Sequence, residues 1–194
     1  MRSQWRPALV LLVYFTVLTG VVYPLAVMAI GQLAFHAEAE GSVIASDGRV
    51  AGSRLIGQSF TSPGYFWSRL SATAHVPYDA SASTGTNLGP LAPALTDAAR
   101  ARIAALRAAD STLTGPIPVD LVTSSGSGLD PEESPEAAFI QVPRVARARG
   151  LEPAVVRALV ERHLEPRTLG VFGEPRVNVL MLNLSLDSLA HATR

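Results

Sequence analysis

The residues best placed for chemistry lie in a serine- and glycine-rich run, TSSGSGLDPEESP, at residues 123–135. Just before it, residues 119–123 (VDLVT) are typical of a short strand, and just after it a helix is predicted. Gly126 and Gly128 permit a sharp turn between the two. Asp130 is suited to capping a helix start, and Ser134 before Pro135 offers a second such start. A strand, a glycine turn and a capped helix can together hold an anion on backbone N–H groups.

Two properties of this run argue against a phosphate site. It matches neither G-x-x-x-x-G-K-[ST] nor G-x-G-x-x-G, the patterns that cradle phosphates. Three acids, Asp130, Glu132 and Glu133, would repel an anion there. The residues therefore favour a rigid structural turn over a nucleotide site or a flexible linker.

The residues that other common kinds of catalysis require are missing or scattered. The 16 basic residues are all arginine, so no lysine is available for a P-loop or a Schiff base, and there is no cysteine for a thiol nucleophile. The four histidines are scattered and G-x-S-x-G is absent, which disfavours a serine hydrolase and predicts no metal site. His163, between Glu161 and Glu165, is interpreted as part of a solvated helix face.

The elements that position these residues begin with a long apolar segment. Residues 7–35 contain no charged side chain, and about 20 apolar residues are enough to span a bilayer. A cleaved signal peptide is the alternative, because Ala37-Glu38-Ala39 resembles a cleavage site. Signal peptides have apolar cores of only about 7–15 residues, so length favours an uncleaved anchor.

Charges flanking this segment predict its orientation. Arg2 and Arg6 precede it, whereas Glu38 and Glu40 follow it, so the N-terminus is expected in the cytoplasm. We therefore expect two parts: a cytoplasmic tip and transmembrane helix at residues 1–36, and an extracytoplasmic domain at residues 37–194. No basic stripe indicates nucleic-acid binding.

The second part is predicted to be one mixed α/β domain. Helices are expected at residues 94–110, 135–149 and 153–165, and strands at residues 54–60, 119–123 and 176–189. The last strand is expected to be central because it is apolar on both faces. Between the strand at residues 54–60 and the helix at residues 94–110, Tyr65, Phe66 and Trp67 are interpreted as part of a loop attached to the core by its aromatic rings. A contact with a partner or with lipid is the alternative.

Six blocks of sequence, in order, resemble the C subunit of the Kdp potassium-transporting P-type ATPase. They are GSRLIGQSF, YFWSRLSA, GTNLGP, PVDLVTSSGSGLDPEESPEAA, VPRVARARGL and GEPRVNVLMLNLSLD. The resemblance runs from the apolar segment to about Asp187. Leu70, Leu91-Ala92 and Glu133 depart from the family pattern, in loop detail.

This resemblance implies an accessory, non-catalytic subunit of an ATP-driven potassium uptake complex in the cell inner membrane, required for assembly and activity. Its implied partners are a channel-like potassium-binding subunit, the P-type ATPase subunit, a small single-span subunit and membrane lipid, with no nucleic acid. No cofactor is expected to bind tightly. The predicted external location favours a cap on the channel-like subunit, and a membrane-anchored hydrolase or binding protein is the remaining alternative.

The resemblance also implies a second role, as a catalytic chaperone that raises the affinity of the hydrolysing subunit for ATP. The residues that would then contact the nucleotide are Ser124, Ser125, Gly126, Ser127, Gly128 and Gln141. An outer domain would not meet cytoplasmic ATP, so the two roles require opposite orientations.

Overall fold

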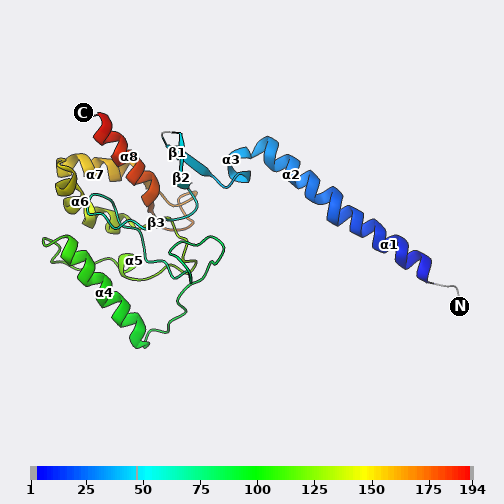
Figure 1. The fold of residues 1–194 in the computed structure, drawn as a ribbon, viewed down its shortest axis with the longest axis horizontal. Helices are drawn as coiled ribbons and strands as arrows, with labels where there is room; N and C mark the ends of the chain where they lie inside the picture. Colours follow the sequence, from blue (N-terminus) through cyan, green and yellow to red (C-terminus); the bar gives the residue numbers. More distant parts are fainter. Residues whose placement is uncertain (1–3, 47, 193–194) are drawn as a thin grey trace. The chain divides into compact units, whose positions relative to one another are not determined.

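The computed structural model describes residues 4–46 and 48–192. The chain divides into two compact units between Val43 and Ile44. A long apolar helix dominates the first, and a domain of short strands and helices forms the second (Figure 1). The predicted class, one apolar helix followed by a mixed α/β domain, is confirmed.

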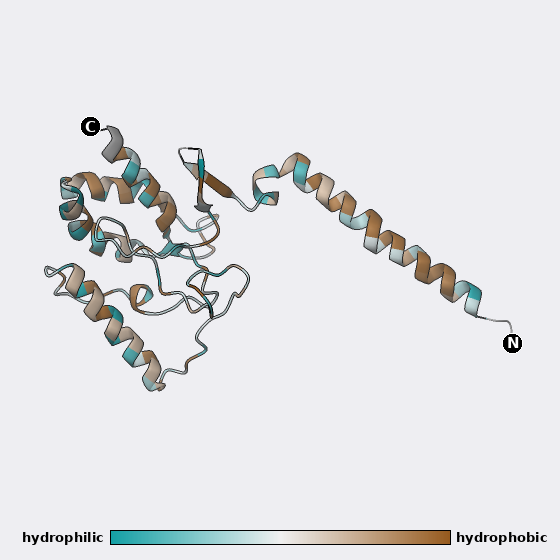
Figure 2. Cartoon of the chain, in the orientation of Figure 1, coloured by the Kyte–Doolittle hydropathy of each residue, from teal (hydrophilic) through white to brown (hydrophobic). Residues whose placement is uncertain are grey.

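The apolar helix runs continuously over Trp5–Ala34 and is long enough to cross a membrane. It consists of α1 (Trp5–Val17), a π-helical segment η1 (Leu18–Val22) and α2 (Tyr23–Ala34). The wider π turn lies just before Pro24, which has no N–H to donate to the carbonyl four residues earlier. Most residues along it are apolar (Figure 2), and the described side chains of α1 and α2 are not buried within the chain. A short helix, α3 (His36–Ala39), follows.

Two small sheets occur in the described chain. Strands β1 (Val43–Ser46) and β2 (Arg49–Ser53) pair with each other, and Asp47 between them lies outside the described residues. The other sheet is antiparallel, with β5 (Arg176–Asn178) between β3 (Glu132–Glu133) and β4 (Leu164–Glu165). Glu133 is opposite Val177 in one pair, and Leu164 is opposite Val177 in the other. This sheet therefore holds together segments far apart in sequence.

Helices α6 (Pro135–Arg149), α7 (Pro153–Arg162) and α8 (Val179–Ala192) build the main core next to this sheet. Ser134 caps α6 by accepting a hydrogen bond from the Ala137 N–H, and Gly150 ends it with a φ of 66°. The helix predicted at residues 135–149 is confirmed. A second core cluster joins α4 (Pro93–Ala109) and α5 (Val119–Val122) through Leu106, Leu121 and Trp67.

Two of the three predicted strands are wrong, and the third is strand only at its start, where it is central in its sheet as predicted. Residues 54–60 are irregular, and residues 119–122 form the single helical turn α5. Of residues 176–189, only Arg176–Asn178 is strand, and the rest is α8. The Asn178 side chain caps this helix by accepting from the Met181 N–H at 3.1 Å, and Leu182 and Leu186, four residues apart, face the core. An apolar run buried on both faces of a strand and one buried in a helix look alike in sequence.

The proposed role of Asp130 as a helix cap is also wrong. Its Oδ1 accepts from the Glu132 N–H at 3.0 Å, which shapes a local turn leading into β3. Ser134 caps the helix instead.

Candidate functional site

The serine–glycine run folds as a turn stabilised by its own side chains. Ser125 Oγ accepts a hydrogen bond from the Gly128 N–H at 2.8 Å, and Ser127 Oγ accepts from the Leu129 N–H at 3.1 Å. Gly128 has a φ of 68°, in the left-handed region that favours glycine. The sharp glycine turn predicted here is present, although a helical turn precedes it where a strand was predicted.

A second loop, at residues 71–84, contacts this turn through hydrogen bonds. The Thr84 N–H donates to Ser127 O at 2.9 Å, and Ser71 Oγ donates to Gly128 O at 2.7 Å. A Cβ on Gly128 would lie 2.7 Å from Thr84 O, so the two backbones approach as closely as glycine permits. These contacts support the interpretation of a rigid structural turn.

Gln141 lies in the protein interior, 3% exposed. Its Oε1 accepts from the Trp67 N–H at 2.8 Å and from Arg144 Nη2 at 2.6 Å. Its Nε2 donates to Glu133 Oε2 at 3.0 Å and lies within 3.3 Å of Trp67 O. The amide thus joins α6 to the aromatic loop and to β3, and its hydrogen-bonding capacity is used within the fold.

The aromatic loop is attached to the core, as predicted. Phe66 is fully buried and Trp67 is 8% exposed, whereas Tyr65 is half-buried with its hydroxyl donating to Asp187. The Trp67 ring is contacted by two guanidinium groups, Arg144 at 4.7 Å and Arg102 at 5.2 Å from the ring centre. Burial lowers the pKa of Arg144 to about 10, so this residue remains charged at neutral pH.

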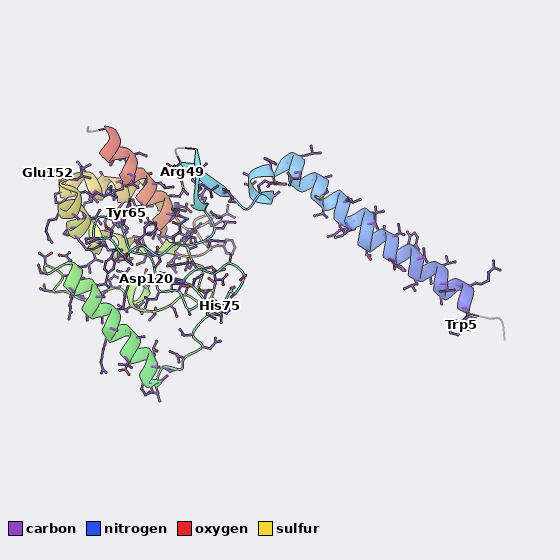
Figure 3. All side chains as sticks on the ribbon, in the orientation of Figure 1. Trp5, Arg49, Tyr65, His75, Asp120 and Glu152 are labelled. Carbon is purple, nitrogen blue, oxygen red and sulfur yellow. The ribbon has the colours of Figure 1, made fainter. Side chains whose placement is uncertain are left out.

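The α/β domain contains a groove of about 980 Å³, here called the acidic groove. It is lined by residues 116–120, 132–134 and 173–176, together with Arg69, Asp130, Glu136 and Ile140. Asp120, on α5, is labelled in Figure 3. None of the residues at 124–128 lines the groove, and neither does Gln141. The predicted nucleotide residues therefore do not meet around this cavity, and their contact with ATP stays a prediction.

Glu133 is an unusual component of the groove wall because it is 3% exposed. Burial raises its pKa well above the ordinary value of 4.5, and the neighbouring Asp120 carboxylate raises it further. Oε2 accepts from Gln141, whereas Oε1 has no hydrogen-bond partner among the described residues. The departure from the family pattern at Glu133 was interpreted as loop detail, but the residue lies in strand β3 and is buried.

His163 does not lie on a solvated face, contrary to the prediction. The ring is half-buried, with Nδ1 2.9 Å from Leu159 O and Nε2 2.9 Å from Ser185 Oγ, and so links α7 to α8. Packing of α8 against α7 causes this burial, and the misassignment of α8 as a strand concealed it. Within residues 4–46 and 48–192, no group of three His, Cys, Asp or Glu side chains is placed to hold a metal ion.

A single apolar helix followed by a small α/β domain places the chain among single-span, membrane-anchored proteins with one soluble domain. The family model described as "K+-transporting ATPase, c chain" matches residues 5–188, and the chain belongs to this family.

Its curated relatives agree along nearly the whole length. The chain is 59% identical to the potassium-transporting ATPase KdpC subunit of Herpetosiphon aurantiacus over 189 residues, which is 97% of this chain and 98% of the relative. It is 60% identical to the subunit of that name from Sorangium cellulosum, over 96% of this chain and 98% of the relative. The subunit from Dechloromonas aromatica is 58% identical, over 98% of this chain and 100% of the relative. The family resemblance inferred from six sequence blocks is thereby confirmed.

Proposed function

We propose that this chain serves a potassium-transporting ATPase as a membrane-anchored cap, with its α/β domain outside the cell membrane and against the channel-like subunit. Its family makes it an accessory subunit of a potassium uptake complex. The location and the partner surface are the parts we propose.

The charge distribution around the apolar helix carries the proposal. Arg2 and Arg6 precede Trp5–Ala34 or lie at its start, and Glu38 and Glu40 follow it. Positive charge is retained on the cytoplasmic side of bacterial inner-membrane segments, which favours an inner-membrane helix with its N-terminus inside. The domain that follows would then be external.

The apolar helix also supports a role in assembly. Its side chains make no buried core of their own, so they are available for lipid and for helices of other subunits. We infer that the channel-like, P-type ATPase and small single-span subunits are the partners. Gly20 and Gly31 leave room for close helix approach, because a Cβ on Gly20 would meet nothing within 4 Å and one on Gly31 would meet only Ala39 Cβ, at 3.8 Å.

The nucleotide role is less compatible with the geometry. Binding ATP through residues 124–128 would compete with the hydrogen bonds that hold the turn, and Gln141 would have to leave the core. The nearby acids of the groove would also repel phosphate. These contacts favour the cap over the chaperone.

Cysteine labelling of the assembled complex tests the orientation. The chain has no cysteine, and Ser46 and Ser111 are exposed positions in the domain, whereas Gln4 precedes the helix. Ser46→Cys and Ser111→Cys should react with a membrane-impermeant thiol reagent in intact spheroplasts. Gln4→Cys should react only after lysis. The reverse pattern would reject the external cap and return residues 124–128 to consideration as a nucleotide contact.

A further inference from the structure

The acidic groove is strongly unbalanced in charge. Six acids line it, Asp120, Asp130, Glu132, Glu133, Glu136 and Glu174, against two arginines. Both arginines are already paired, Arg69 with Asp130 at 2.6 Å and Arg176 with Glu132 at 2.8 Å. Asp120, Glu133 and Glu136 form no ion pair within the part of the chain that the structure describes. An entering cation would therefore find two carboxylates, those of Asp120 and Glu136, not yet neutralised.

Glu133 provides an independent sign of a missing partner. This carboxyl group is 3% exposed, lines the groove, and has one oxygen without a hydrogen-bond donor among the described residues. Buried carboxyl oxygens are normally satisfied, because leaving one unpaired costs about 1–3 kcal/mol. A cationic donor brought into the groove by another molecule would favour the ionised carboxylate and satisfy this oxygen.

The remaining walls of the groove are apolar. Ile117, Ile140 and three prolines contribute to them, and Val119 at the edge is 71% exposed. A volume of about 980 Å³ far exceeds an inorganic ion, and no metal-binding group is present within the described ranges. Arginine and lysine match both features, since their aliphatic stems cover apolar surface while their charged ends reach carboxylates.

We propose that the acidic groove is a docking site for a partner subunit, and that it receives an arginine or lysine carried on a segment with apolar neighbours. The cationic end pairs with Asp120 and Glu136 and donates to the free oxygen of Glu133, whose proton leaves to solvent as the cation docks. Charge complementarity selects this occupant over an anionic ligand, which the unpaired carboxylates of Asp120 and Glu136 would repel. The inference applies on either side of the membrane and does not depend on the orientation proposed above.

Photocrosslinking in the purified complex identifies the occupant. A benzophenone amino acid at Val119, on the groove edge, should crosslink to another subunit, and mass spectrometry should find Arg or Lys in the crosslinked segment. The same probe at Val155, an exposed position on α7 outside the groove, should not give that crosslink. Crosslinks from Val119 to lipid alone, or to a segment without a basic residue, would overturn the proposal.

Charge reversal tests the chemistry. Glu136 is exposed and forms no ion pair in the described chain, so Glu136→Arg should leave the fold intact. It should lower the recovery of the other subunits, measured as the amount that co-purifies with this chain, by about tenfold, equivalent to about 1.4 kcal/mol. Glu161→Arg, the same change at an exposed site on α7, should alter recovery by less than about twofold. Exchanging the crosslinked basic residue for Glu should restore recovery with Glu136→Arg. Normal recovery with Glu136→Arg, or failure of that exchange to restore it, would contradict the docking.

A potassium site is distinguished by a third measurement. Thermal unfolding of the isolated full chain in detergent should be equal in KCl and NaCl at one ionic strength. Stabilisation by potassium that Asp120→Asn abolishes would identify an ion site and overturn docking of a side chain.

Discussion

Gln141 shows how a single side chain can look functional in sequence and prove structural in the fold. Its amide joins Trp67, Arg144 and Glu133, from three separate segments, inside a region closed to solvent. Buried polar networks of this kind rigidify a core when all members are satisfied, and they are costly when one is removed. The residue thus contributes to stability whether or not a nucleotide binds nearby.

Replacing Gln141 should consequently destabilise the chain. Gln141→Leu would leave the buried Trp67 N–H and Arg144 Nη2 without an acceptor, and we expect a loss of about 2–4 kcal/mol in the free energy of unfolding. Trp67 fluorescence in a Trp5→Phe background, followed in urea, measures it. Gln58→Leu, which removes one bond from a half-buried amide, should lose less than about 1.5 kcal/mol. Unchanged stability in Gln141→Leu would indicate that the amide is not structural.

Glu133 should make stability depend on pH. Its pKa is raised in the folded chain by burial and then by Asp120, so the folded state holds a proton that the unfolded state has lost. Stability from this group is complete below the ordinary value of 4.5 and falls as pH rises towards the folded pKa, by up to about 1.4 kcal/mol per pH unit. Glu133→Gln has nearly the shape of the protonated carboxyl group but has no proton to lose in this pH range.

Unfolding temperatures of the two proteins across this range test the dependence. Glu133→Gln should gain on the parent chain steadily as pH rises above 4.5. Parallel curves would mean that Glu133 is ionised or solvated in the folded chain.

At the scale of elements, the turn at residues 124–128 is positioned by its neighbours as much as by its own residues. The 71–84 loop donates hydrogen bonds to the backbone carbonyl oxygens of the turn, and the two backbones approach each other most closely at Gly128. Gly126, two residues earlier, is exposed, and a Cβ there would meet nothing within 4 Å. The two glycines thus have different requirements within one turn.

Alanine at each glycine measures this difference. Gly128→Ala combines a positive φ with a clash against Thr84 O, and we expect a loss of about 2–4 kcal/mol in stability. Gly126→Ala should stay within about 0.5 kcal/mol of the parent chain. Ser125→Ala, which removes the acceptor for the Gly128 N–H, should fall between them. Equal unfolding midpoints for both glycine variants would show that the turn is mobile.

At the scale of the whole molecule, an apolar anchor and an α/β domain must act through other subunits. The family belongs to an ATP-driven transporter, yet this chain has no D-K-T-G motif and no lysine. An aspartyl-phosphate intermediate needs a carboxylate in a site built to receive the γ-phosphate. The acidic groove is unsuited to that task because it repels phosphate.

The purified chain alone should therefore not hydrolyse ATP. Phosphate release should stay at background with magnesium and potassium present, while the assembled complex supplies the positive control. Turnover by the isolated chain that persists after removal of contaminating ATPases would refute this expectation.

Sequence alone determined the features that depend on local chemistry and on long, unambiguous patterns. The apolar span and three helices, observed at Pro93–Ala109, Pro135–Arg149 and Pro153–Arg162, follow from apolar length and helical periodicity. The third helix was predicted to reach residue 165, but residues 164 and 165 pair as strand β4. Six ordered blocks were enough to identify the family.

Tertiary structure decided which apolar runs became strands and which polar groups were buried. Residues 179–192 form a helix because Leu182 and Leu186 pack into a core built by α6 and α7, which no local pattern reveals. Contacts from segments tens of residues away bury Glu133 and Gln141 and half-bury His163, which no local pattern indicates. Burial is a property of the assembled chain, so the acidic groove could be recognised only after residues from 69 to 176 were brought together.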